Sequence, residues 1–178
     1  MKNTVAILID CWQGELTGLH SRIVNWLDSN QDRLDTVVLA SYWTEPRELF
    51  LDTAWHRTAR ARAAQFDWQH RPAEATDPSI LTWVNSSVYQ TAMQSIEDFQ
   101  RLRLEREQIT RVMLMGSSWD GCVEHRPLGW RSLAQNTDLD IVSHCDLTKP
   151  YTGYMRANPL PPGWQRHESG LLTLTKNK

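Results

Sequence analysis

Residues 4–9 (TVAILI) form an unbroken run of β-branched and aliphatic side chains that ends at Asp10. A strand that is apolar at every position is typical of a parallel sheet covered on both faces. Further apolar runs predict strands at residues 36–40, 81–84, 111–115, 140–143 and 171–174, and apolar side chains at helical spacing predict helices at 17–29, 90–107 and 121–134. This alternation indicates βαβ units. We therefore predict an α/β fold with a doubly wound, mainly parallel six-stranded sheet and helices on both faces, a Rossmann-like three-layer arrangement.

The length of 178 residues favours one domain, because single domains centre near roughly 100–150 residues. Two segments interrupt the alternation. Residues 44–79 form an insertion that holds Arg57, Arg60 and Arg62, and these arginines indicate either a solvated helical face or a lid that contacts anions. Residues 148–164 are rich in Pro, Gly and aromatic side chains. A long loop of this kind either covers a site or joins a subunit contact.

Charge and cysteine content exclude several classes of protein. The net charge of −2 gives no basic field to hold nucleic acid. The apolar run that ends at Asp10 is too short to span a membrane. Three cysteines without CxxC spacing argue against a secreted disulfide scaffold and against a zinc site. We expect a cytoplasmic protein without a metal or cofactor and without a nucleic-acid or membrane partner.

Two positions stand where an open α/β sheet binds its ligands, which is beyond the carboxyl ends of the strands. Asp10 follows the first strand, and residues 116–124 (GSSWDGCVE) follow the strand at 111–115. Cys122 is expected to begin a helix, whose free N–H groups favour a thiolate and an oxyanion. Taken singly, a strand-end Asp is more often a turn former and a lone Cys more often a small buried apolar residue.

Together these segments resemble the isochorismatase-like cysteine hydrolases. Residues 6–10 (AILID) are similar to that family's first strand, residues 116–124 to its nucleophile signature, and residues 141–146 (IVSHCD) to its fifth strand with a terminal Asp. The resemblance implies an oligomeric hydrolase that cleaves amides, vinyl ethers and related small substrates with an Asp–Lys–Cys triad. It makes Asp10 the base and Cys122 the nucleophile. It also implies a cis peptide near Ser117 and Ser118 that aims backbone N–H groups at the substrate.

The chain departs from this family at the position of the lysine. The expected position falls near Trp83, and no lysine occurs between Lys2 and Lys149. Without a cation, a nearby carboxylate disfavours the thiolate. His125, Arg126 or an arginine of the 57–62 segment are the candidates to replace it. The Asp-x-His metal motif of the nicotinamidase branch is also absent after the second strand.

Tryptophan is unusually frequent in this chain, with nine residues. We predict that a small-molecule site is lined by Trp12, Trp43, Trp83, Ser117, Ser118 and Trp119, since indoles can stack on a flat or cationic ligand. The alternative is that these indoles only fill the space left by the lysine and the substrate.

Two functions follow from this pattern. The first is an isochorismatase-like hydrolase with Asp10, Cys122 and an altered triad. The second is a catalytically inactive protein on the same fold that binds a small molecule or another partner. The resemblance implies a homo-oligomer, a dimer or higher, in both cases.

Overall fold

The computed structural model describes residues 2–11, 17–40, 77, 79–80, 89–93, 95–117, 119, 121–149 and 160–175. Most of the predicted insertion at 44–79, and the middle of the loop at 148–164, lie outside the described residues. The strands are β1 (Thr4–Ile9), β2 (Leu34–Ala40), β3 (Tyr89–Ala92), β4 (Arg111–Ser117), β5 (Asp140–Lys149), β6 (Trp164–Arg166) and β7 (Leu171–Leu174). The helices are α1 (Thr17–Ser29), α4 (Ile96–Glu105), α5 (Cys122–His125) and α6 (Trp130–Asn136).

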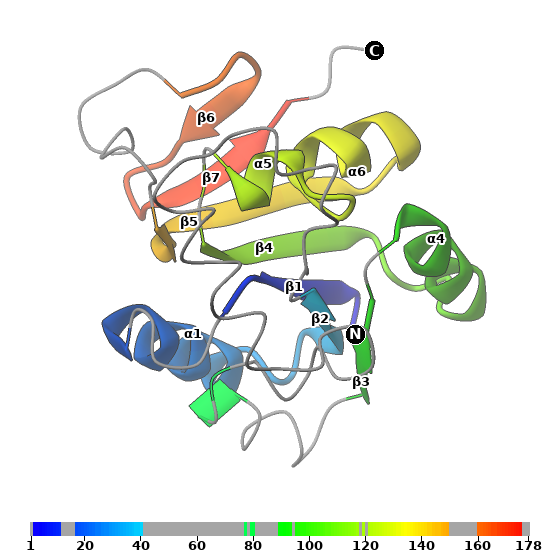
Figure 1. Cartoon of the computed structure of the whole chain (residues 1–178), viewed down its shortest axis with the longest axis horizontal. Helices are drawn as coiled ribbons and strands as arrows, with labels where there is room; N and C mark the ends of the chain where they lie inside the picture. Colours follow the sequence, from blue (N-terminus) through cyan, green and yellow to red (C-terminus); the bar gives the residue numbers. More distant parts are fainter. Residues whose placement is uncertain are drawn as a thin grey trace, which may run out of the picture.

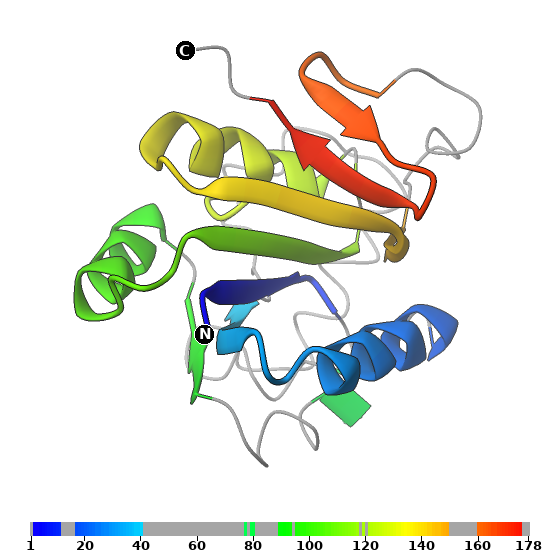
Figure 2. The same cartoon turned by 180° about the vertical axis from the view of Figure 1, so that it is seen from behind.

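The strands form one sheet in the order β3-β2-β1-β4-β5-β7-β6, which Figure 1 shows from the β6 edge to the β3 edge. The five strands β3, β2, β1, β4 and β5 are parallel to one another. β7 pairs antiparallel with both β5 and β6. Figure 2 shows this last pair, in orange and red, beside β5. The sheet is therefore an α/β sheet as predicted, but it is mixed rather than mainly parallel and has seven strands instead of six.

Two hydrophobic cores cover the two faces of the sheet. β1 is buried along its whole length, and its side chains alternate between the cores. Val5, Ile7 and Ile9 belong to the core that includes Phe99 of α4 and Val123 of α5. Ala6 and Leu8 belong to the core that α1 covers with Leu19, Ile23 and Leu27. The continuous apolar run of β1 thus reflects helices on both faces, which confirms that part of the prediction.

The structure corrects the predicted elements between β2 and β4. The strand predicted at 81–84 lies outside the described residues. Residues 90–92, predicted as the start of a helix, belong to β3, which pairs with β2 from Thr36 to Leu39. The helix begins only at Ile96, because the Ser95 side chain accepts a hydrogen bond from the Asp98 N–H and caps it.

The predicted helix at 121–134 is two short helices, α5 and α6. Pro127 cannot donate the N–H that would continue α5. Gly129 lets α6 begin against α5, because a Cβ there would lie 2.8 Å from the backbone of Glu124 and Val123. This junction fixes the direction of the residues that follow Cys122. None of the described helices has the length and apolar character needed to cross a membrane.

Candidate active site

The chain adds β2 and β3 on one side of β1 and then returns to add β4 and β5 on its other side, so the switch point of the sheet lies between β1 and β4. Ligands of open α/β sheets bind beyond the carboxyl ends of the strands at such a point. Ile9, the last residue of β1, pairs with Gly116 of β4. Asp10 and the segment that leads to Cys122 therefore leave the sheet side by side.

Asp10 has an unusual backbone. Its φ is 50°, the only positive φ of a non-glycine residue in the described part of the chain. Its side chain is buried, with 1% of the residue exposed. Left-handed backbone at a non-glycine residue costs free energy and is concentrated at functional sites.

Gly116 makes the close approach of β4 to β1 possible. Its φ is 115°, and a Cβ at this position would lie 1.9 Å from the carbonyl oxygen of Ile9. No other residue fits there. The signature glycine predicted from the sequence therefore has a steric role, which is to let the chain turn from β4 towards Cys122.

Cys122 is the first residue of α5, as the sequence predicts, and it is buried. α5 is a single turn of helix, so it supplies little of the dipole that a longer helix would offer. The Cys122 carbonyl accepts the N–H of Arg126 at 3.1 Å, which closes that turn. The side chain of Arg126 therefore starts one helical turn beyond the thiol.

Arg126 supplies the cation at this site. Its Nε and Nη2 each lie 3.4 Å from Oδ2 of Asp10. The guanidinium is nearly buried, with 10% of the Arg126 side chain exposed, and the Asp10 carboxylate is buried. Because both groups are buried, water and salt screen their attraction little. Of the replacements considered for the missing lysine, His125 instead faces Glu124 and is largely exposed. The Arg57, Arg60 and Arg62 cluster lies outside the described residues.

A second ion pair holds the chain around Arg126 in place. Glu124 is buried, and its Oε1 accepts a hydrogen bond from Nε of Arg131 at 2.6 Å. The Arg131 guanidinium also lies 4.8 Å from the centre of the Trp130 ring. The Glu124–Arg131 ion pair therefore joins α5 to α6 across the turn that contains Arg126.

The other two cysteines are poor nucleophiles. Burial raises the pKa of the Cys11 thiol far above its ordinary value, and the charges of Asp10 and Asp77 raise it further. Cys145 is half-buried, and its Sγ donates to the carbonyl oxygen of Gly170 at 3.0 Å. Cys122 is the one cysteine that begins a helix.

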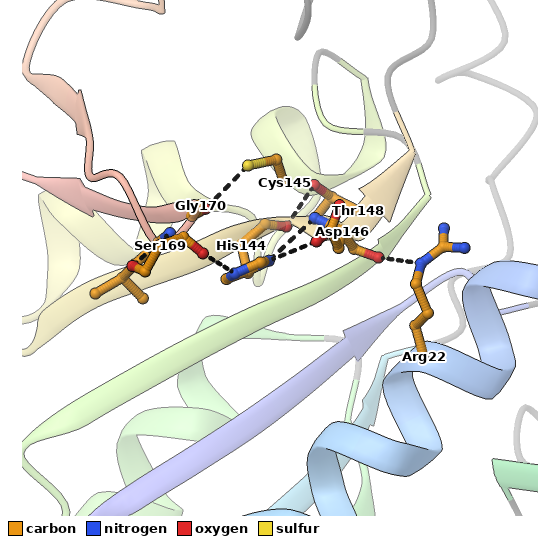
Figure 3. Close-up of polar contacts among 8 residues, drawn as sticks. Arg22, His144, Cys145, Asp146, Thr148, Ser169 and Gly170 are labelled. Atoms are coloured by element: carbon orange, nitrogen blue, oxygen red, sulfur yellow. Dashed lines mark hydrogen bonds and ion pairs between the residues drawn. The ribbon is translucent and has the colours of Figure 1, made fainter.

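Asp146, which the resemblance places at the end of the fifth strand, lies within β5. β5 bulges between Ser143, which pairs with Leu114 of β4, and Thr148, which pairs with Gly116 of β4. More residues of β5 than of β4 lie between these two pairs. Figure 3 shows the bulge: the Asp146 carbonyl accepts from Nε of Arg22 on α1 at 2.8 Å, and its N–H donates to Nδ1 of His144. The Asp146 carboxylate is exposed. The residue therefore joins α1 to β5 through its backbone.

Trp119 and Ser117 are the predicted ligand-lining residues that the structure describes. Trp119 is buried, and its ring packs edge-on against Trp164 with 4.7 Å between the ring centres. This placement is that of a core residue. Ser117 ends β4 half-exposed and pairs with Lys149, the last residue of β5. Trp12, Trp43, Trp83 and Ser118, with the predicted cis peptide, lie outside the described residues.

Comparison of the chain with protein-family models, with curated proteins and with solved structures finds no match in any of the three. The site must therefore be judged by its own geometry. Among the described residues, no group of three or more His, Cys, Asp or Glu side chains is arranged to hold a metal ion.

Proposed function

We propose that the protein is a cysteine hydrolase of small carbonyl compounds, with Cys122 as nucleophile, Asp10 as base and Arg126 as the cation of an altered triad. The observation that carries this proposal is the contact of the Arg126 guanidinium with the Asp10 carboxylate, one helical turn beyond Cys122. An isochorismatase-like hydrolase needs a cation at this place, and the sequence offers no lysine there.

The proposed reaction has two steps. In the first, the Cys122 thiol gives its proton to Asp10 and the sulfur attacks the carbonyl carbon of an amide. The C–N bond breaks, the leaving amine takes the proton from Asp10, and the acyl group stays on the sulfur as a thioester. In the second, Asp10 takes a proton from water, the resulting hydroxide attacks the thioester carbon, and the C–S bond breaks. The carboxylic acid leaves, and Asp10 returns its proton to the Cys122 sulfur.

An arginine changes what the cation can do in this reaction. The guanidinium stays charged at every accessible pH, so it cannot donate or accept a proton. It can balance Asp10 and favour the thiolate by its charge alone. The cation therefore takes no part in the proton transfers of the two steps, and the proton of the Cys122 thiol goes to Asp10.

The test is the capture of the acyl group on Cys122. The full chain is incubated with small aryl amides and esters, quenched in acid and analysed by peptide mass spectrometry. We expect an acyl adduct on Cys122, its loss and the loss of turnover in Cys122→Ala, and slower formation of the adduct in Asp10→Asn. The matched control is Cys145→Ala, which should keep both adduct and turnover. Turnover that survives in Cys122→Ala would refute the proposal.

A second function, that of an inactive small-molecule-binding protein, is favoured by the burial of Cys122, of which 7% is exposed. A thiol so covered in the unliganded protein is hard for a substrate to reach. This alternative predicts a ligand that quenches tryptophan fluorescence and binds Cys122→Ala as tightly as the unmodified chain. Binding that requires the thiol would count against it.

A further inference from the structure

A second polar group lies near the carboxyl end of β1, on the α1 side of the sheet. His20 belongs to the first turns of α1 and has 1% of its surface exposed. Its Nδ1 lies 3.0 Å from Oδ2 of Asp77. Nδ1 faces this carboxylate, whereas Nε2 makes no hydrogen bond to another described residue. A buried polar atom without a hydrogen bond is uncommon and calls for an explanation such as a role in catalysis or in ligand binding.

Asp77 fixes the protonation of the ring that it faces. Burial alone would raise the pKa of Asp77, but hydrogen bonds from the side chain and the N–H of Ser79, together with the His20 contact, lower it below its usual range. An ionised carboxylate only accepts hydrogen bonds. The proton of a neutral His20 ring therefore belongs on Nδ1, and Nε2 keeps its lone pair.

The backbone joins this pair to the candidate active site. The Asp77 N–H donates to the carbonyl oxygen of Cys11 at 2.9 Å, and Cys11 follows Asp10 directly. The charges of Asp10 and Asp77 act together on the Cys11 thiol. His20 and Asp77 are therefore close to the carboxyl end of β1, where the sheet is expected to bind its ligand.

His144 provides the contrast within the same protein. Its Nδ1 accepts the Asp146 N–H at 3.1 Å, and its Nε2 faces the carbonyl oxygen of Ser169 at 2.8 Å (Figure 3). The proton of a neutral His144 ring must then be on Nε2. Both of its nitrogens have partners within the fold, so this histidine serves the structure.

We propose that His20 and Asp77 form a histidine–carboxylate dyad whose Nε2 accepts a proton from a hydroxyl, an N–H group or a water molecule bound at the carboxyl end of β1. The donor keeps the electron pair of its broken bond, the proton moves to Nε2, and the Asp77 carboxylate balances the imidazolium that forms. Shielding of Nε2 from bulk water restricts this exchange to molecules admitted into the site. The inference rests on the proposed function in that it places the ligand at the same edge.

The first arm of the test needs no activity. Long-range proton–nitrogen NMR of the ¹⁵N-labelled full chain near neutral pH reports which nitrogen of each histidine carries the proton. We expect Nδ1–H for His20 and Nε2–H for His144. Asp77→Asn should remove the preference at His20 and leave His144 unchanged. An Nε2–H signal at His20 in the unmodified chain would overturn the dyad.

The second arm measures hydrolysis of p-nitroacetanilide across pH. His20→Gln should lower kcat by about a hundredfold with little change in KM and alter the dependence of kcat on pH. If His20→Gln fails to fold, Asp77→Asn is the second variant, and it should lower kcat less and alter the same dependence. His144→Gln is the matched control and should keep the profile.

The two arms separate failure of the dyad from failure of the proposed function. If His20→Gln hydrolyses the amide with an unchanged pH profile, the dyad is refuted, whereas the proposed role of Cys122 is unaffected. If the unmodified chain hydrolyses no probe amide, the hydrolase proposal fails, and the position of the proton on His20 alone decides for or against the dyad.

Discussion

Among single residues, Asp10 is the most unusual in its carboxylate, its backbone and its charge partner. It is buried, its φ is positive, and Arg126 lies against it. The sequence pointed to Asp10 and Cys122 as candidate site residues because both follow predicted strands, and open α/β sheets bind ligands beyond the carboxyl ends of their strands. It could not choose among His125, Arg126 and the 57–62 arginines, because the direction of a side chain depends on the break between α5 and α6.

A double-mutant cycle measures how strongly Asp10 and Arg126 are coupled. Asp10→Asn and Arg126→Gln should each lower the free energy of unfolding by on the order of 3 kcal/mol, since removing one partner of a buried pair strands the other charge. The double variant should lose clearly less than the sum. The control is the exposed pair Arg111 and Asp140, at 3.6 Å, whose coupling should stay below about 1 kcal/mol. Additive losses at Asp10 and Arg126 would contradict the proposed ion pair. Urea denaturation provides these values.

At the scale of elements, patterns that depend on neighbouring residues were predictable. The strand at Thr4–Ile9, the helix at Thr17–Ser29 and the strand at Leu171–Leu174 match their predicted bounds. β3 was missed because its strand character comes from pairing with β2, some fifty residues away in the sequence, which no local pattern reports. Ser95, with Asp98 three residues on, was the local signal that marks the true start of α4.

The contact of β4 with β1 can be tested at Gly116. Gly116→Ala should destabilise the protein by about 3 kcal/mol or more, because the new methyl group meets the Ile9 carbonyl and the backbone has a positive φ. Gly18→Ala is the matched control: its Cβ meets nothing nearer than 3.6 Å, within α1. It should stabilise the helix by up to about 1 kcal/mol. Equal midpoints of urea unfolding for the two variants would refute the steric role of Gly116.

In the whole molecule, the two cores were predictable from the unbroken apolar run of β1. The edge strand β6, which pairs with β7, was not predictable from the sequence. β6 has only three residues, Trp164–Arg166, two of them exposed, and it follows a segment rich in proline and glycine. Its pairing with β7 depends on the turn at residues 167–170, where Gly170 has a φ of 85°. Such a short, polar edge strand has no apolar pattern by which it could be recognised.

Acid stability should depend on Asp35, which ties β2 to the end of α4. Burial would raise the pKa of Asp35, but hydrogen bonds from Thr36 and Gln108 and the charge of Arg106 outweigh it and lower the pKa. A carboxyl whose pKa is lower in the folded state stabilises the protein above its ordinary pKa, near about 4, and loses this effect as pH falls through the folded value. The free energy of unfolding should therefore be higher in the unmodified chain than in Asp35→Asn at pH 7, and the two should converge below about pH 3. Parallel curves would contradict the assignment.

The proposed mechanism requires that Arg126 activates Cys122. The most direct measurement is the rate at which iodoacetamide alkylates Cys122 in the native chain at pH 7, followed by peptide mass spectrometry. We predict faster alkylation of Cys122 than of Cys145, and a loss of about tenfold or more in Arg126→Gln, since a nearby cation shifts a thiol by one or more pKa units. Lys149→Gln, which removes the cation at the end of β5, should leave the rate unchanged. A Cys122 that reacts no faster than Cys145, or at the same rate with and without Arg126, would contradict the account.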